Sequence, residues 1–299
     1  MQFFFEVLIG GLLAGVMYSL VALGFVLIYK ASGVFNFAQG AMVFFAALTF
    51  VGLQEKFALP FWVAFACTLA VMIALGVLTE RIVLRPLVNQ PQISLFMATI
   101  GLAFFLEGFA QLIWGTEVRP LDIGIKNEPI QWVMDRFNML IIKTDAVAAL
   151  VAGLLVSVLA VFFNRTRIGR ALRAVADDHQ AALAVGIPLK QIWAIVWSVA
   201  GFVALVAGLM WGARGGGVQF ALTFTALKAL PVLILGGFES IAGAIVGGLI
   251  IGASEKVAEV YLGPHVGGGI EGWFAYVMAL MFLLVRPEGL FGEKHIDRV

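Results

Sequence analysis

Apolar runs long enough to cross a bilayer recur along almost the whole of this chain. Such runs cover residues 6–29, 60–79, 93–114, 145–163 and 191–211, and each is close to the roughly 20 residues that a membrane-spanning helix needs. The composition agrees, because 62% of residues are hydrophobic and 12% are charged, whereas soluble domains are about 45–50% apolar and about 25% charged. A soluble fold of this length would lack the polar surface to cover itself, so the chain is expected to be an integral membrane protein.

The chain is predicted to form one all-α polytopic domain over residues 1–299, with two broken regions. Residues 31–40 interrupt the first apolar stretch, which resumes and continues to residue 53. The run 224–235 is too short to span alone and passes through GGFES (236–240) into the run 241–257, which Ser254 to Lys256 is expected to close. In that last run, glycines at 243, 247, 248 and 252 predict tight packing against a neighbouring helix. With 271–285, we expect eight to ten membrane segments, including broken or re-entrant helices.

Charge decides which side each loop occupies, because short loops rich in Lys and Arg stay in the cytoplasm. Residues 164–190 carry five Lys or Arg and two acids, so this segment is predicted to be cytoplasmic. Residues 80–87 form a second such loop, in which Glu80 is expected to join a surface ion pair with the neighbouring arginines. The longest polar insertion, 115–144, holds four acids and four bases, and it is assigned to the periplasm.

The motifs that mark most enzymes do not occur in the sequence. It contains no GxxxxGK[ST], HExxH or GxSxG, and its three histidines are scattered, so neither a catalytic residue nor a metal ligand is predicted. The formal net charge of +1 argues against a nucleic-acid partner. Polar groups within the apolar runs are few, namely Glu107, Gln111, Lys228 and Glu239. Such a chain is better suited to passing a molecule across the membrane than to reacting with it.

Polar residues within or beside the spans are candidates for a translocation path. The break at 31–40 has two interpretations: an interfacial turn in which Asn36 caps the next helix, or non-helical backbone that lines a protected cavity. Glu107 lies within a span, where an acid points to a functional site, although it is close enough to the interface to reach headgroups or water. The candidate set is Asn36, Gln39, Glu107, Gln111, Glu239 and Ser240.

The segment 164–190 also has the pattern of a short docked helix. From Ile168 onwards the pattern is helical and ends at Gly186 followed by Pro188. The residues that recur at spacings of three to four are Leu172, Val175, His179, Ala182 and Gly186. A mildly apolar face of this kind suits a groove in a protein better than it suits lipid. The alternative is a solvated connecting loop.

Several motifs in this order resemble those of a transporter family. QAAxxxG at 180–186 is similar to the EAA loop of bacterial ABC importer permeases, with Gln in place of Glu. Over nearly its full length the chain resembles the H-type first permease of high-affinity branched-chain amino acid ABC transporters. The motifs that carry this resemblance are VFNFAQG (34–40), RPL (85–87), RALRAVADD (170–178), LGGFESIAGA (235–244) and RPEGLFG (286–292).

The resemblance implies a subunit of an importer in the bacterial inner membrane, with a fold like the vitamin B12-type importer core. A periplasmic binding protein would deliver branched-chain or related hydrophobic amino acids, and a second homologous permease would enclose the path. Two ATPases would bind ATP and magnesium, so this chain is expected to hold no cofactor and to catalyse no reaction. Permeases for urea or short-chain amides form a related alternative, and a self-sufficient secondary transporter is a further one. The residues implied in coupling to the ATPase are Arg170, Arg173, Asp177, Asp178, Gln180, Ala181, Ala182 and Gly186.

Overall fold

Helices form nearly all the regular structure of the computed structural model, which describes residues 2–87, 90–177, 182 and 184–292. The described residues contain no strand, and the all-α prediction is confirmed. The long helices are α1 (Gln2–Ser32), α2 (Gln39–Phe57), α3 (Phe61–Leu78), α4 (Gln92–Trp114), α6 (Lys143–Arg165), α9 (Leu189–Arg214) and α11 (Ile241–Tyr261). The shorter elements are η1 (Thr79–Leu84), η2 (Arg85–Leu87), α5 (Gln131–Phe137), α7 (Arg167–Asp177), η3 (Phe220–Ala226), α10 (Ala229–Gly236), α12 (Gly263–Val266), η4 (Ile270–Gly272) and α13 (Phe274–Val285).

The number of membrane segments falls within the expected range. Among the described residues, seven helices are long and apolar enough to cross a membrane, and Phe220–Gly236 and Phe274–Val285 add two shorter apolar segments. One predicted boundary is wrong, because Ser254 to Lys256 do not close the helix that contains them. The Ser254 hydroxyl donates to the carbonyl of Ile250 at 2.7 Å, and α11 continues to Tyr261. Two charged side chains, Glu255 and Lys256, therefore lie within α11.

The chain divides into two compact units. Unit 1 comprises Met1–Leu23, Gly124–Val156 and Leu227–Val299, and unit 2 comprises Gly24–Ile123 and Ser157–Ala226. Helices α1 and α6 are each divided, with one part in unit 1 and the other part in unit 2. The insertion 115–144 is likewise divided between the units, with the short helix α5 in unit 1.

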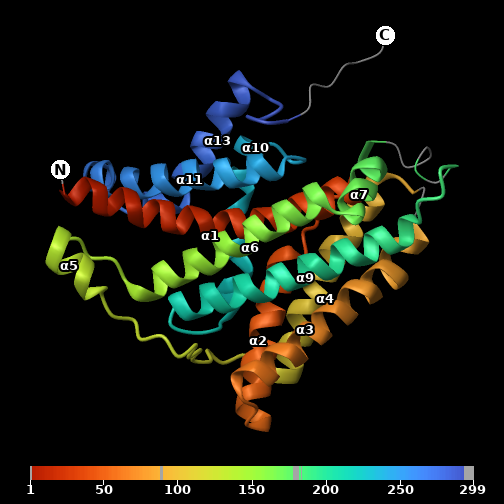
Figure 1. Cartoon of the computed structure of the whole chain (residues 1–299), viewed down its shortest axis with the longest axis horizontal. Helices are drawn as coiled ribbons and strands as arrows, with labels where there is room; N and C mark the ends of the chain where they lie inside the picture. The colour runs from red at the N-terminus through yellow and green to blue at the C-terminus, as the bar shows by residue number, and fades with distance from the viewer. Residues whose placement is uncertain (1, 88–89, 178–181, 183, 293–299) are drawn as a thin grey trace. The chain divides into compact units, whose positions relative to one another are not determined.

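Unit 2 is built on close contact between α3 and α9, which lie side by side and run in opposite directions (Figure 1). A Cβ atom added at Gly76 would lie 2.7 Å from the backbone nitrogen of Ser198, and one added at Gly201 would lie 3.0 Å from the carbonyl of Met72. Small residues permit this approach, which in lipid supplies much of the packing energy between helices. Helix α2 packs against α9 and also against α4.

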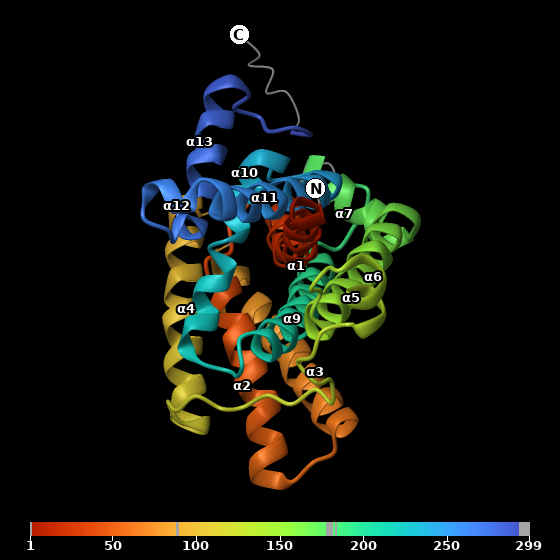
Figure 2. The same ribbon diagram turned by 90° about the vertical axis from the view of Figure 1, so that its left-hand side faces the viewer.

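Unit 1 is built on α11, which packs against both α1 and α10 (Figure 2). A Cβ atom at Gly11 would lie 2.6 Å from the carbonyl of Gly252, and one at Gly15 would lie 2.5 Å from that of Gly248. The α1 segment of this unit therefore runs antiparallel to α11. The predicted tight packing of the α11 glycines is confirmed by these contacts.

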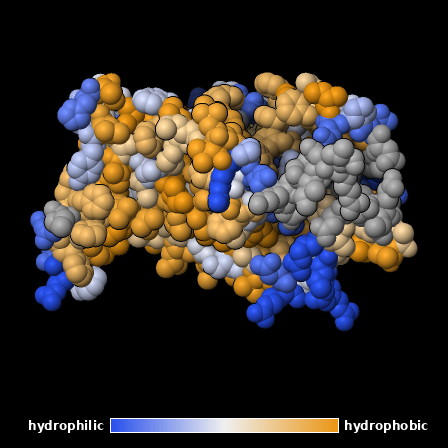
Figure 3. All heavy atoms as spheres, turned by 90° about the horizontal axis from the view of Figure 1, so that it is seen from above, coloured by the Kyte–Doolittle hydropathy of each residue, from blue (hydrophilic) through white to orange (hydrophobic). Residues whose placement is uncertain are grey.

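Much of the surface is apolar, as a membrane protein requires. Figure 3 shows one face on which hydrophobic residues predominate and hydrophilic ones gather in separate groups. Large side chains are exposed along several spans, including Phe104 at 70%, Leu112 at 82% and Leu150 at 69%. In water such side chains would be hidden, whereas in a bilayer they face hydrocarbon.

Candidate translocation and coupling sites

The break between α1 and α2 lies in unit 2 and has buried polar side chains, although Gly33 and Phe37 are exposed. Gly33 ends α1 with a φ of +67°, and its N–H donates to the carbonyl of Tyr29 at 2.7 Å, which is a common way for a helix to terminate. The following Asn36 has an exposed fraction of 0%. Its Oδ1 accepts from the N–H of Ala38 at 3.1 Å and its Nδ2 donates to Oε1 of Gln39 at 3.2 Å. This geometry has features of both interpretations, because Asn36 accepts from the N–H that precedes α2 while its own side chain is buried.

Helix α4 holds this break in place. The Thr99 hydroxyl accepts from the N–H of Phe37 at 3.3 Å and lies 3.2 Å from the carbonyl of Phe35. The rings of Phe35 and Phe37 are 4.6 Å apart, and Phe96 packs edge-on to Phe37 at 4.7 Å. The non-helical backbone therefore has side-chain partners in place of helical ones, as burial in a membrane demands.

We expect Thr99→Val to destabilise the break. The change keeps the side-chain shape but leaves the part-buried N–H of Phe37 without its acceptor, which costs about 1 kcal/mol. Thermal unfolding in detergent should show the melting temperature reduced by several degrees, at roughly 2–4 °C per kcal/mol. Thr99→Ser retains the hydroxyl and is the matched control. Equal melting temperatures for the valine variant and the wild type would contradict the assigned role.

Gln39 is the second buried polar residue of the break. Its exposed fraction is 0%, and among the described residues its Nε2 has no hydrogen-bond partner. The side chain lies over α1, where a Cβ atom at Gly24 would be 2.5 Å from Nε2. Glycine at position 24 leaves room for this amide, and the fold brings Asn36 and Gln39 into contact.

The other four candidate path residues lie on α4 in unit 2 and just before α11 in unit 1. Glu107 and Gln111 are partly exposed and lie one turn apart on α4, about two turns beyond Thr99. Ser240 belongs to unit 1 and caps α11, since its hydroxyl accepts from the N–H of Gly243 at 3.0 Å. Glu239 beside it is exposed. The six residues therefore do not form a single site within either unit.

A charged cluster in unit 1 was not predicted from the sequence. Lys228, at the start of α10, places its Nζ 2.7 Å from Oε1 of Glu255 on α11. The Tyr18 hydroxyl on α1 lies 3.4 Å from both Nζ and Oε1. Lys228 could be identified in the sequence as an intramembrane cation, but Glu255 was assigned to the end of its helix and Tyr18 carried no signal. The three residues are far apart in the chain, so only the fold brings them together.

A tight corner joins α6 to α7 in unit 2. The Thr166 hydroxyl accepts from the N–H of Gly169 at 3.2 Å, as an N-terminal cap does. Arg173 extends back to the end of α6, where its guanidinium donates to the carbonyls of Phe163 at 2.8 Å and Asn164 at 3.5 Å. Those carbonyls have no partner within their own helix. Arg173 therefore couples the position of α7 to that of α6.

The apolar face of this segment needs a corrected interpretation. Leu172, Val175 and Ala182 have exposed fractions of 1%, 0% and 2%, so the face predicted to dock into a partner packs against this chain instead. The helical spacing identifies a buried face but not what buries it. Arg170 is exposed, and the exposed Gly186 has a φ of +83°. Asp178, Gln180 and Ala181 lie outside the described residues, as does the side chain of Asp177.

Basic residues gather at the end of unit 2 that holds the α6–α7 corner. Trp193, near the start of α9, donates from Nε1 to the carbonyl of Ala31 at 2.9 Å, which places the end of α1 beside the start of α9. Because α3 runs antiparallel to α9, its end and the following Arg81 and Arg85 lie there too. Helix α7 also contacts α9. This end therefore brings together the end of α1, the η1–η2 segment and α7, each of which carries Lys or Arg.

The expected ion pair of Glu80 is present but is not at the surface. Arg85 donates to both carboxylate oxygens, at 3.1 Å from Nε and 2.8 Å from Nη2. The Glu80 side chain is 2% exposed and that of Arg85 is 39% exposed. The burial arises because α3 continues as the π-helix η1, which packs against α9 and α4. This paired, buried carboxylate holds η2 to η1 through charge-assisted hydrogen bonds.

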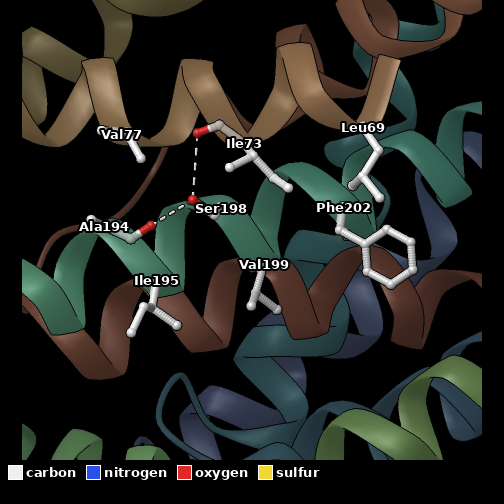
Figure 4. A pocket seen from close by; sticks show the side chains of 8 residues that line it. All are labelled: Leu69, Ile73, Val77, Ala194, Ile195, Ser198, Val199 and Phe202. Atoms are coloured by element: carbon white, nitrogen blue, oxygen red, sulfur yellow. Dashed lines mark hydrogen bonds between the residues drawn. The ribbon is translucent and has the colours of Figure 1, made fainter. Parts of the chain in front are cut away.

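An apolar groove between α3 and α9 has a volume of about 490 Å³ (Figure 4). Its lining is aliphatic or aromatic apart from Ser198. The Ser198 hydroxyl points to backbone carbonyls, at 2.7 Å from that of Ala194 and 3.5 Å from that of Ile73. The lining therefore offers hydrocarbon contacts, which do not suit recognition of a charged solute.

The chain matches a family of transport proteins over almost its full length. Residues 7–286 match the family described as branched-chain amino acid transport system / permease component. The chain is 28% identical to the high-affinity branched-chain amino acid transport system permease protein LivH of Salmonella typhimurium, covering 99% of this chain and 98% of LivH. It is also 28% identical to the corresponding BraD of Pseudomonas aeruginosa, again over 99% and 98%.

More distant similarities extend beyond amino acid permeases. The fructose import permease protein FruF of Bifidobacterium longum is 27% identical over 91% of this chain and 75% of its own length. Among solved structures, PsaBC from Streptococcus pneumoniae in complex with Fab aligns with 92% of this chain and 89% of its own, at 15% identity and a TM-score of 0.47.

Proposed function

Because this chain belongs to the family of permease components of branched-chain amino acid transport systems, we propose that it is the membrane-spanning subunit of an ATP-driven importer for branched-chain amino acids. The chain is a multi-pass protein of the bacterial inner membrane. The family match over residues 7–286 is the observation that carries this proposal. ATP and magnesium would be held by two partner ATPases, and a periplasmic binding protein would deliver the substrate to this chain and a second permease.

The basic end of unit 2 supports a cytoplasmic coupling site. Under the positive-inside rule, the end that carries Arg81, Arg85 and Arg170 faces the cytoplasm, and residues 115–144 then face the periplasm. We place the ATPase contact on the α6–α7 corner and the residues that follow it. The exposed, basic side of α7 would meet the ATPase, while its buried Leu172 and Val175 would transmit movement to the spans.

The break at Asn36 and Gln39 supports a place on the translocation path. Both residues are buried, and among the described residues Nε2 of Gln39 has no hydrogen-bond partner, which is costly in a membrane unless the group has a function. We propose that they lie beside the path in the state described here. Glu107, Gln111, Glu239 and Ser240 remain candidates for other parts of the path.

The proposal predicts ATP-dependent uptake of leucine, isoleucine or valine. Membrane vesicles that contain the chain and its partner subunits should accumulate radiolabelled leucine only when ATP and the binding protein are supplied. Uptake without ATP would instead favour a self-sufficient transporter. Calorimetry on the binding protein distinguishes the remaining substrates: tight binding of urea or a short-chain amide, and not of leucine, would overturn the assignment to amino acids.

A further inference from the structure

Lys228 and Glu255 form an ion pair that lies within the apolar part of unit 1. Their Nζ and Oε1 atoms are 2.7 Å apart, and the side chains are 34% and 4% exposed. The Lys228 ammonium also lies 5.7 Å from the centre of the Tyr18 ring. One member of the pair is therefore accessible, and the other is buried behind it. Ionisable groups within membrane segments are expensive and usually mark the route of a substrate or ion.

The pair retains hydrogen-bonding capacity that the fold does not use. An ammonium group has three N–H donors, and Lys228 directs them to two partners, Glu255 and Tyr18. Within the part of the chain that the structure describes, the second carboxylate oxygen of Glu255, Oε2, has no hydrogen-bond partner. An unused donor and an unused acceptor thus lie on adjacent groups of opposite charge.

Holding the helices together does not account for this pair. Glycine contacts already bring α11 to α1, where a Cβ atom at Gly15 would be 2.5 Å from the carbonyl of Gly248. They also bring α11 to α10, where one at Gly247 would be 2.7 Å from the carbonyl of Val232. Such packing is what joins helices in lipid, whereas a buried ion pair contributes little net stability once desolvation is counted.

We propose that Lys228, Glu255 and Tyr18 form a transient binding site for the zwitterionic head of an α-amino acid. The substrate carboxylate would accept from the accessible Lys228 and draw its ammonium away from Glu255, whose carboxylate is covered until then. The substrate ammonium would then donate to Glu255, with the Tyr18 hydroxyl between the two. The proposal rests on the proposed import function and adds which part of the substrate is recognised. Because the pair must share its charges with the ligand, binding is weak, and weak binding allows a transported solute to leave again.

Exchanging the charges of Lys228 and Glu255 tests recognition of the substrate separately from the structural role of the ion pair. The double variant K228E/E255K keeps an ion pair between the same helices but reverses the charge at each position. We expect it to melt within a few degrees of the wild type while uptake of leucine by the complete transporter falls at least tenfold. Each single variant, K228E or E255K, should lose stability as well as uptake, because it leaves like charges together. Wild-type uptake by the exchanged variant would overturn the proposal.

A second ion pair in the same unit supplies the matched control. Lys256 and Glu271 lie 2.6 Å apart with side chains 42% and 35% exposed, and Lys256 is adjacent to Glu255 on α11. The exchange K256E/E271K should leave leucine uptake within twofold of wild type. A loss equal to that of K228E/E255K would mean that any charge exchange at this end of α11 is harmful, and the assignment of a specific site would fail.

Glu255→Gln keeps the test decisive if the exchanged variant does not fold. The amide oxygen can still accept from Lys228, but the NH2 group that replaces the second carboxylate oxygen cannot accept from the substrate ammonium, and the negative charge is lost. We therefore expect uptake of leucine to fall at least fivefold, and unchanged uptake would overturn the site. Competition in wild-type vesicles tests the proposed function separately. If excess leucinamide, which lacks the carboxylate, blocks uptake as well as excess leucine does, the head-group site is wrong but import stands. If labelled leucine is not taken up at all, the import function itself fails.

Discussion

Replacing Gly11 with leucine is expected to lower the melting temperature in detergent by about 5–10 °C and to remove most transport. The Cβ atom alone would lie 2.6 Å from the carbonyl of Gly252 and 2.8 Å from Cα of Ala253, so α1 and α11 must separate. Overpacking of this kind costs about 1–3 kcal/mol even where neighbours can adjust, and here the neighbours are backbone atoms. In lipid the loss is not offset by a hydrophobic effect, because packing is what holds the helices together.

Gly10→Leu is the matched control for this result. Gly10 precedes Gly11 on the same helix, and no described atom lies within 4 Å of a Cβ placed there. The control adds the same side chain and the same helix propensity, but it projects into open space. We expect its melting temperature to stay within about 2 °C of wild type. If Gly10→Leu and Gly11→Leu lowered the melting temperature equally, the contact between α1 and α11 would not be the cause.

The same helix contact indicates how far the sequence alone could lead. The glycines of α11 could be recognised as a close-packing surface, because only small residues allow backbones to approach in a membrane. Their partners could not be recognised, since a glycine carries no information about which helix it meets. Gly15 and Gly248 are 233 positions apart, and the fold pairs them through backbone contact alone.

The charged cluster was missed for a related reason. A carboxylate near the end of an apolar run is ordinarily placed in water, so Glu255 was assigned to the helix end. The helix in fact continues for six more residues, to Tyr261, and Lys228 compensates the buried charge. The partner that makes burial tolerable lies on another element, and local sequence does not report it.

The segment after α6 is a case in which the pattern was correct and its interpretation was not. The spacing of Leu172 and Val175 correctly predicts a helix with one protected face. Amphipathic spacing is the same whether the face packs on its own chain or on another protein, so the choice of a partner groove had no physical basis in the spacing itself. Arg173 also differs from expectation, because it binds the end of α6 instead of solvent or a partner.

The α6–α7 corner leads to a second strong prediction, in which Gly169→Ala uncouples transport from ATP hydrolysis. An added Cβ at Gly169 would lie 2.7 Å from Cα of Phe163 and still closer to its carbonyl, the same carbonyl that Arg173 binds. The methyl group would therefore push α7 away from α6 and break the link that Arg173 makes. If the corner transmits ATPase movement to the spans, uptake of leucine should fall at least tenfold while the complex continues to hydrolyse ATP.

Gly108→Ala provides the comparison, because it makes the same change in a helix where no described atom lies within 4 Å of the new Cβ. We expect it to retain uptake within twofold of wild type. The ratio of leucine imported to ATP hydrolysed, measured in the same proteoliposomes, distinguishes the possible causes. A fall in both rates together would indicate that Gly169→Ala prevents assembly, whereas an unchanged ratio with normal rates would show that the α6–α7 corner is not the coupling element. Only a reduced ratio in an assembled complex is consistent with Gly169 and Arg173 holding α7 where it can move the spans.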